Sequence, residues 1–280
     1  MGKSGSHKKE DPFVVRQTNR LRESFNEAAE LYHEARPGYP EVLFDDLVSL
    51  SGIPDGGRVL EIGCGTGQAT APLARRGYRI LCVELGANMA AVARRTLASF
   101  PAVDVVTADF EEWPTEAESF DLVTSATALH WIDPSIRYHK IARVLRPGGA
   151  VAPFWYAHVH MDADRGFFEE VQGIYERVAP QIVGPTDQVL QRPDDLPAGE
   201  VTEIEATGLY GPVTVRRYPF QVQYDTASYI NVLNTYSGHR TLALDVRQRL
   251  LDGIAQLMDT QYDGRITKGY LAMLYIAHRS

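Results

Sequence analysis

The sequence contains little cysteine and no long apolar run. Its 280 residues include only Cys64 and Cys82, and both fall in stretches expected to be buried. Buried free thiols are therefore favoured over a disulfide, which fits a protein of the reducing cytoplasm. No uninterrupted apolar stretch could span a bilayer, and the polar N-terminal residues do not resemble a secretory signal. We expect a cytoplasmic protein without a membrane partner, whose residues 1–17 form a disordered tail.

Positive charge is also scarce. The chain has 28 lysines and arginines against 36 aspartates and glutamates, which gives a net charge of −8. A general nucleic-acid-binding surface is therefore not expected, and no nucleic-acid partner is predicted. A chain of this length can bury a full core, as one large domain or as a domain with a lid. The composition does not indicate an oligomeric state.

Apolar strand-like segments alternate with helix-like segments after residue 57. The expected strands are Arg58–Ile62, Arg79–Glu84, Val103–Thr107, Phe120–Ser125 and Ala150–Trp155. The expected helices between them are Gln68–Arg76, Asn88–Ser99 and Ser135–Val144. Such an alternation indicates a parallel sheet that is covered on both faces. Sheets of this kind bind ligands at the carboxyl ends of their strands.

The flanking regions are less regular. Two helices, Thr18–His33 and Glu41–Leu50, are expected before the alternation. After it, Trp155–His160 is expected to leave the fifth strand as a loop. The later expected elements are a helix at Asp164–Val178, an irregular connection at Gln181–Gly199, an extended segment at Val213–Tyr224, helices at Thr226–Tyr236 and Leu242–Met258, and a strand at Gly269–His278.

A glycine-rich turn follows the first strand, in Leu60-Glu61-Ile62-Gly63-Cys64-Gly65-Thr66-Gly67. Glycines there allow positive φ and a close approach of a ligand to the backbone. The helix that follows offers free N–H groups to an anion, and Glu61 can accept hydrogen bonds from a ligand ammonium or hydroxyl group. The spacing is G-x-G-x-G, not the G-x-G-x-x-G of dinucleotide-binding proteins. A βα turn that binds no ligand is the alternative interpretation.

This turn, with its preceding acid, closely resembles motif I of the class I S-adenosylmethionine (SAM) dependent methyltransferases. The resemblance implies an α/β fold with a Rossmann-like, seven-stranded, mostly parallel sheet, an antiparallel last strand and a helical lid. Within that superfamily the chain resembles the small-molecule branch that includes trans-aconitate methyltransferases. The segments that carry this resemblance are Tyr32 with Arg36-Pro37-Gly38-Tyr39-Pro40, Leu129-His130-Trp131-Ile132-Asp133 and Thr235-Tyr236-Ser237-Gly238-His239.

The pattern and the resemblance together divide the chain into four parts. Residues 1–17 are the tail, and residues 18–57 are an N-terminal helical lid. Residues 58–158 form the SAM-binding, Rossmann-like core. Residues 159–280 supply the C-terminal strands of the sheet and a helical lid insertion between them.

The resemblance also implies a cofactor site for SAM. Its residues would be Tyr32, Arg36, Glu61, Gly63, Cys64, Gly65, Gln68, Glu84, Leu85, Met89, Asp109, Phe110, Ser125 and Ala126. Glu84 suits two vicinal ribose hydroxyls, and a solvated strand-end acid is the alternative. Asp109 would accept a hydrogen bond from the adenine amine while Phe110 packs on the ring, unless Asp109 only caps a turn. Met89 would pack near the adenine or serve only in the core.

Arg36 and Tyr32 precede the core and could close over the cofactor. Arg36 could pair with the carboxylate of SAM. A surface ion pair of Arg36 with Glu34 or Asp45 is the alternative.

The acceptor side is predicted from three segments. The substrate-binding candidates are Trp131, Trp155, Tyr156, His158, Tyr236, His239 and Arg240. His130 is the catalytic candidate, a general base for a hydroxyl or amine acceptor. The alternatives are a structural His130–Trp131 pair, a solvent-facing loop after the fifth strand, and a loop that caps the late helices. His158 and His160 have no acidic or cysteine partner at a recognised spacing, so no metal is predicted.

These features predict a transferase that moves a methyl group from SAM to an oxygen or nitrogen atom of a small molecule. A carboxylate acceptor would need no base, and Arg36, Arg137 or Arg240 could hold it. Two other classes stay open. An NAD-dependent oxidoreductase is disfavoured by the glycine spacing and by the absence of a Tyr-x-x-x-Lys set. A non-catalytic SAM-binding protein would share most of the same residues.

Overall fold

The computed structural model describes residues 26–164, 166–183 and 190–280. The expected tail and the first part of the expected helix Thr18–His33 lie outside these residues. Among the described residues, no helix is both long enough and apolar enough to cross a membrane. Cys64 and Cys82 are both buried and unpaired, as the sequence predicted.

The core is one seven-stranded sheet with the strand order β3-β2-β1-β4-β5-β7-β6. The strands are β1 Arg58–Ile62, β2 Arg79–Glu84, β3 Val103–Thr107, β4 Phe120–Ala126, β5 Leu145–Val159, β6 Thr214–Asp225 and β7 Arg265–His278. Neighbouring strands from β3 to β5 are parallel, and β7 runs antiparallel to both β5 and β6. This arrangement confirms the predicted fold class.

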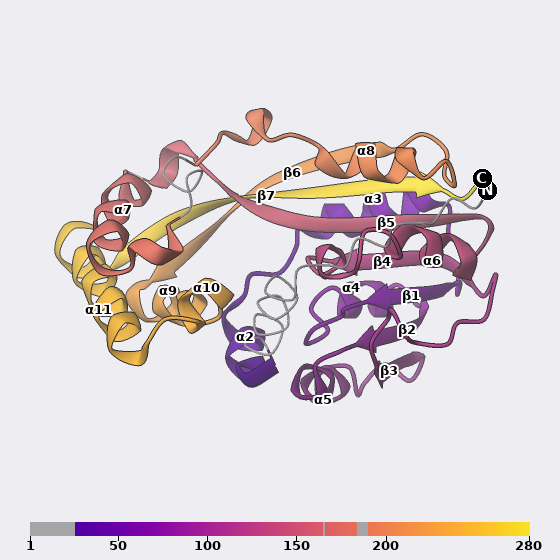
Figure 1. The fold of residues 1–280 in the computed structure, drawn as a ribbon, viewed down its shortest axis with the longest axis horizontal. Coiled ribbons are helices and arrows are strands. Elements are labelled where there is room, and N and C mark those ends of the chain that lie inside the picture. The colour runs from indigo at the N-terminus through magenta and orange to yellow at the C-terminus, as the bar shows by residue number, and fades with distance from the viewer. Residues whose placement is uncertain (1–25, 165, 184–189) are drawn as a thin grey trace, which may run out of the picture.

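Helices cover both faces of the sheet (Figure 1). They are α2 Ala29–Ala35, α3 Glu41–Ser51, α4 Thr70–Arg75, α5 Ala87–Thr96, α6 Arg137–Val144, α7 Phe167–Val178, α8 Gly199–Ala206, α9 Thr226–Leu233, α10 Ser237–Arg240 and α11 Leu244–Gln261. A short 3-10 helix, Leu129–Trp131, follows β4. One apolar cluster packs α3 and α4 on the sheet, and a second packs α6 and α8 on the opposite face.

Strands β5, β6 and β7 extend well beyond the rest of the sheet. Their far end carries α7, α9, α10 and α11, which we call the helical unit, and Figure 1 shows it at the opposite end of the molecule from β1–β3. Its own apolar cluster includes Phe167, Leu250 and Ile254. Helices α9, α10 and α11 lie in the chain between β6 and β7, where the sequence predicted a helical insertion, and a lid role for them stays a prediction.

The predicted loop at Trp155–His160 was wrong. Strand β5 runs on to Val159, because it pairs with β7 as far as the Val159–Gly269 register position. Strand β7 likewise begins at Arg265 rather than Gly269, since residues 265–268 pair with the end of β6. Helix α8 begins at Gly199, the last residue of the predicted irregular connection, and no element was predicted between that residue and Val213.

Candidate active site

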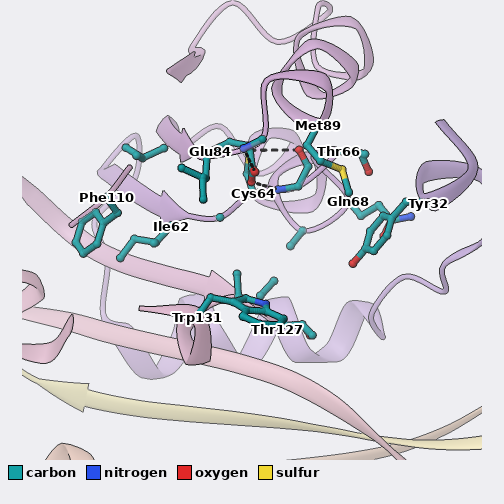
Figure 2. Close-up of a pocket in the computed structure, with 18 of the residues that line it drawn as sticks. Tyr32, Ile62, Cys64, Thr66, Gln68, Glu84, Met89, Phe110, Thr127 and Trp131 are labelled. Carbon is teal, nitrogen blue, oxygen red and sulfur yellow. Dashed lines mark hydrogen bonds between the residues drawn. The ribbon is translucent and has the colours of Figure 1, made fainter. Parts of the chain in front are cut away.

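A cavity of about 590 Å³ opens at the carboxyl ends of the core strands. The predicted cofactor residues that line it are Tyr32, Arg36, Gly63, Cys64, Gly65, Gln68, Glu84, Leu85, Met89, Asp109, Phe110 and Ala126. Figure 2 shows Phe110 and Tyr32 at opposite ends of this cavity, with Cys64 and Glu84 between them. The structure thus brings together residues that are far apart in the sequence. We call this space the cofactor cavity, after the ligand that the sequence predicts for it.

The turn after β1 requires its glycines for two different reasons. Gly63 and Gly65 have φ values of 67° and 58°, in the left-handed region that side chains rarely adopt. A Cβ at Gly63 would lie 2.5 Å from the Cβ of Ala128, so the β4 loop approaches too closely for any side chain. A Cβ at Gly65 would meet no atom within 4 Å, since it would project into the cofactor cavity.

Glu84 is fixed at the wall of the cavity by backbone amides. Its Oε2 accepts from Gly65 N at 2.9 Å and its Oε1 from Gly86 N at 2.8 Å. Burial raises the pKa of the Glu84 carboxyl, and the hydrogen bonds from the backbone oppose that rise. Each carboxylate oxygen has a second lone pair, so Glu84 can still accept hydrogen bonds from two hydroxyls.

Two predicted cofactor residues lie behind the cavity wall. Glu61 is fully buried beneath the turn, and neither of its carboxylate oxygens has a hydrogen-bond partner among the described residues. Burial raises the pKa of Glu61 to about 7. Ser125 is also buried, and its hydroxyl donates to Ile62 O at 2.8 Å. Ser125 therefore braces the ends of β1 and β4.

The other end of the cavity is apolar with one acid. Phe110 and Met89 are nearly fully buried and line the cavity, and Met89 also packs with Ala29 of α2. Asp109 Oδ1 accepts from Glu111 N at 2.8 Å. Asp109 thus caps a turn, as the alternative interpretation held, and it lines the cavity as well.

The segment from α2 to α3 is attached across the top of the cavity. His33 Nδ1 lies 3.1 Å from Thr66 Oγ1 in the glycine turn, and Tyr39 Oη lies 2.6 Å from Thr127 Oγ1 in the β4 loop. Gln68 Nε2 donates to the carbonyl oxygens of His33 and Arg36 at 3.1 and 3.2 Å. Gln68 therefore holds this segment in place.

Arg36 projects from this segment toward the helical unit. Its Nε donates to Thr235 Oγ1 at 2.7 Å, and its guanidinium lies 4.4 Å from the centre of the Tyr236 ring. The proposed partners Glu34 and Asp45 do not hold it; Asp45 pairs with Arg76 at 2.6 Å. No carboxylate among the described residues forms an ion pair with Arg36.

The two other arginines considered for a carboxylate substrate are already paired. Arg137 forms an ion pair with Glu203 of α8. Arg240 forms one with Glu27 at 3.1 Å. Of the three, Arg36 is the one that the described acids leave available.

The alternation of β5 separates its predicted substrate residues. Tyr156 and His158 lie on the face that meets the cofactor cavity and the helical unit. Trp155 lies on the opposite face, stacked on Tyr275 with ring centres 4.7 Å apart. The structure therefore does not bring Trp155 to the cavity, because successive side chains of a strand point to opposite faces. Trp155 was predicted to begin a loop, where the alternation of a strand would not apply, and that prediction was wrong.

His130 and Trp131 both line the cofactor cavity from the 3-10 helix after β4. Their ring centres lie 4.8 Å apart. They form a pair, as the structural alternative held, and they also reach the cavity.

Tyr236, His158 and His239 lie in a buried region between β5 and the helical unit. Tyr236 Oη is 3.2 Å from His158 Nε2, and Tyr175 Oη is 2.7 Å from His239 Nε2. Burial lowers the pKa of His158 and lowers that of His239 to about 4, so both imidazoles are neutral at neutral pH.

One residue of this region was missed at the sequence level. Lys268 donates to Tyr236 Oη at 3.2 Å and is 4% exposed. It directly precedes the expected strand Gly269–His278. A lysine at the start of a strand is ordinarily exposed to solvent. The described residues contain no group of three or more His, Cys, Asp and Glu side chains arranged to hold a metal ion.

Comparison with known sequences gives one family match. Residues 60–152 match a family model described as "Methyltransferase domain". An uncharacterized methyltransferase of Mycobacterium tuberculosis is 29% identical to this chain over 237 residues, which make up 85% of this chain and 86% of that protein.

Comparison with solved structures gives matches along most of the chain. A putative type II methyltransferase from Anaeromyxobacter dehalogenans matches with a TM-score of 0.59 and 21% identity, over 87% of this chain and 97% of that one. Phosphoethanolamine N-methyltransferase 2 of Haemonchus contortus, in complex with phosphomonomethylethanolamine and S-adenosylhomocysteine, matches with a TM-score of 0.55 and 20% identity. This match covers 96% of this chain and 61% of that longer chain. At such identities the likeness establishes the fold.

Proposed function

We propose that this chain, whose residues 60–152 match a methyltransferase domain, is a SAM-dependent methyltransferase that acts on a small molecule. One observation carries the proposal. The carboxylate of Glu84 and the open turn at Gly65 face the same cavity and are joined by a hydrogen bond of 2.9 Å. A ligand fits that arrangement if it carries a ribose and, next to it, a chain that lies against the protein backbone at Gly65.

The residues present fit SAM from one end of the cavity to the other. Phe110 and Asp109 would hold the adenine ring and its amine, and Glu84 would accept from the two ribose hydroxyls. The backbone at Gly63 and Gly65 leaves room for the methionine portion. Glu61, whose oxygens have no hydrogen-bond partner among the described residues, would place an acidic group behind the wall beneath this portion.

The carboxylate of the cofactor would meet Arg36. Arg36 lines the cavity, and its guanidinium has no carboxylate partner among the described residues. Tyr32 lies against it, with its ring centre 5.1 Å from the guanidinium carbon. A charge-assisted pair with Arg36 would fix that end of the cofactor.

SAM supplies an electrophilic methyl group, so the protein mainly has to orient the acceptor and exclude water. The segment that carries Tyr39 covers the cavity and is tied to Thr127 of the β4 loop. His130, at the cavity wall, would take the proton from a hydroxyl or amine acceptor. The acceptor atom would be an oxygen or nitrogen.

The other two classes have weaker support. A dinucleotide oxidoreductase would need a diphosphate at the glycine turn, where Glu84 lies close and carries a negative charge when ionised. A non-catalytic SAM-binding protein would use the same cavity, so only turnover separates it from an enzyme.

Calorimetric titration tests the cofactor assignment. We expect S-adenosylhomocysteine and SAM to bind one site per chain and NAD to bind much more weakly. Tight binding of NAD with no binding of S-adenosylhomocysteine would overturn the proposal.

A further inference from the structure

Lys268 is a buried cation with no acidic partner in the part of the chain that the structure describes. Its ammonium group has three N–H donors, and Tyr236 Oη takes one of them at 3.2 Å. Four aromatic rings surround the ammonium group, with centres 5.4 to 5.7 Å away: Phe168, Tyr229, Tyr236 and Tyr270. Ring faces attract a cation, but they do not replace the hydrogen bonds that it loses on leaving water.

A second cation, which is partly buried, lies against the same tyrosine. The guanidinium of Arg36 is 4.4 Å from the centre of the Tyr236 ring, and the ammonium of Lys268 is 5.4 Å from it. Burial, and then the charge of Arg36, lower the pKa of Lys268 to about 7. Two like charges in one buried region cost free energy unless an anion compensates them.

The other titratable groups around Lys268 supply no negative charge at neutral pH. Burial raises the pKa of each nearby phenol and lowers that of each nearby imidazole. These groups come from every neighbouring element: Tyr156 and His158 of β5, Tyr175 of α7, Tyr224 of β6, Tyr229 of α9, Tyr236 before α10, His239 of α10 and Tyr270 of β7. None of these phenols and imidazoles can therefore serve as the compensating anion.

The cofactor can neutralise only one of the two cations. SAM carries a single carboxylate, which the proposed function assigns to Arg36, the cation that lines the cofactor cavity. Lys268 is then left for a different anion. Tyr156 lines the cavity, and His158 follows it on the same face of β5 and contacts Tyr236, so polar groups lead from the cavity toward Lys268.

We propose that Lys268, with Tyr236 and His158, recognises an anionic group of the methyl acceptor, a carboxylate or a phosphate. The substrate class is then an acidic small molecule. The inference rests on the proposed function, because it takes the cofactor to occupy Arg36. Lys268 acts here as a binding and specificity residue, at a distance from the methyl group that is transferred.

The test uses Lys268→Met, which removes the charge and keeps an unbranched apolar side chain among the rings. The matched control is Arg249→Met on α11, because the Arg249 side chain is 66% exposed and, among the described residues, pairs only with Asp245 of the same helix. Each protein is titrated calorimetrically with succinate, inorganic phosphate and neutral succinamide, with and without saturating S-adenosylhomocysteine.

We expect succinate or phosphate to bind the wild type and the control in the presence of S-adenosylhomocysteine, and succinamide not to bind. Which of the two ligands binds shows whether the site prefers a carboxylate or a phosphate. Lys268→Met should lower the affinity for the anion at least about tenfold, because a charged hydrogen bond is lost. It should leave the affinity for S-adenosylhomocysteine unchanged. Equal anion affinity in Lys268→Met and wild type, or no anion binding to the cofactor-loaded wild type, would overturn the inference.

The titration with S-adenosylhomocysteine itself separates the two proposals. If S-adenosylhomocysteine binds and the anions do not, only the acidic-acceptor inference fails. If the anions bind through Lys268 and S-adenosylhomocysteine does not bind, the cofactor assignment fails and only the anion site at Lys268 stands. Should Lys268→Met not fold, the wild type is titrated at pH 7 in two buffers with different ionisation enthalpies. Anion binding beside Lys268 should take up protons, and binding without proton uptake would count against the inference.

Discussion

The cofactor cavity and the region around Lys268 carry opposite charges. The cavity presents Glu84 and Asp109, with Glu61 beneath its floor. The region around Lys268 presents Lys268 and, at its boundary with the cavity, Arg36. The first is therefore suited to a ligand with hydroxyl, amine and cationic groups, and the second to an anion.

The two regions are also built differently. The acids of the cavity lie at the end of β2 or shortly after β3, at positions that one edge of the parallel sheet brings together. Lys268 and its neighbours come from β5, β7, the helical unit and the segment after α2, and no short motif contains them. If the proposed function holds, cofactor recognition would belong to the core sheet, whereas acceptor recognition would depend on how the long strands hold the helical unit.

The largest effect is expected from Gly65→Val. A β-branched side chain would project into the cavity and resist the φ of 58°, so SAM binding should be lost. Calorimetry measures this, and thermal unfolding serves as the control for folding. Anion binding at Lys268 should persist in the absence of cofactor. Normal SAM affinity in the folded variant would contradict the assignment of the turn.

His130→Ala should lower kcat by about 10²–10⁴-fold when the acceptor atom is a hydroxyl or amine. SAM affinity should stay nearly constant, because the imidazole would act on the acceptor. Steady-state kinetics with separate cofactor titration makes the comparison. A mild effect on kcat would reject the base and indicate a carboxylate oxygen as the methyl acceptor.

Lys268→Met should stabilise the protein without ligands by about 1–4 kcal/mol at pH 7, since it removes an uncompensated buried charge. The folded protein holds the pKa of Lys268 at about 7, below that of the unfolded chain. The penalty is therefore complete below pH 7 and shrinks as the pH rises toward the ordinary lysine range. Urea unfolding at pH 7 and pH 9 should show a smaller difference at pH 9; a destabilised variant at both would mean that Lys268 serves the fold.

Glu84→Ala should weaken SAM binding by about 1–3 kcal/mol, through the loss of hydrogen bonds to a charged acceptor. It should leave the affinity for succinate or phosphate unchanged, because Glu84 lies in the cofactor cavity and not in the region around Lys268. Parallel titrations of the two ligands provide the check. A variant that loses both affinities equally would show that the two regions do not act separately.

The sequence predicted the parts that depend on local patterns. Strands β1, β2 and β3 have the predicted bounds, because each is a short run closed by glycine, an acid or a turn. The glycine turn, Glu84 and Phe110 reach the cavity because each lies at or just beyond the carboxyl end of a strand. The position of these residues follows from the order of the strands alone.

The parts that depend on long-range pairing were not predictable. The length of β5 is set by β7, more than a hundred residues later, and that pairing decides that Trp155 and Tyr156 point to opposite faces. Lys268 was missed because helices α7 and α9 bury it. The residues around position 268 contain no pattern that predicts this packing.

Methyl transfer to paired acceptors tests the central claim most directly. The protein is incubated with methyl-labelled SAM and a panel of small hydroxy and amino compounds, each as the free acid and as its neutral amide. We predict labelled product from an acidic member, with one S-adenosylhomocysteine formed per methyl group, and far less from its amide. Binding of SAM without transfer to any member would contradict the account and leave a non-catalytic SAM-binding protein in its place.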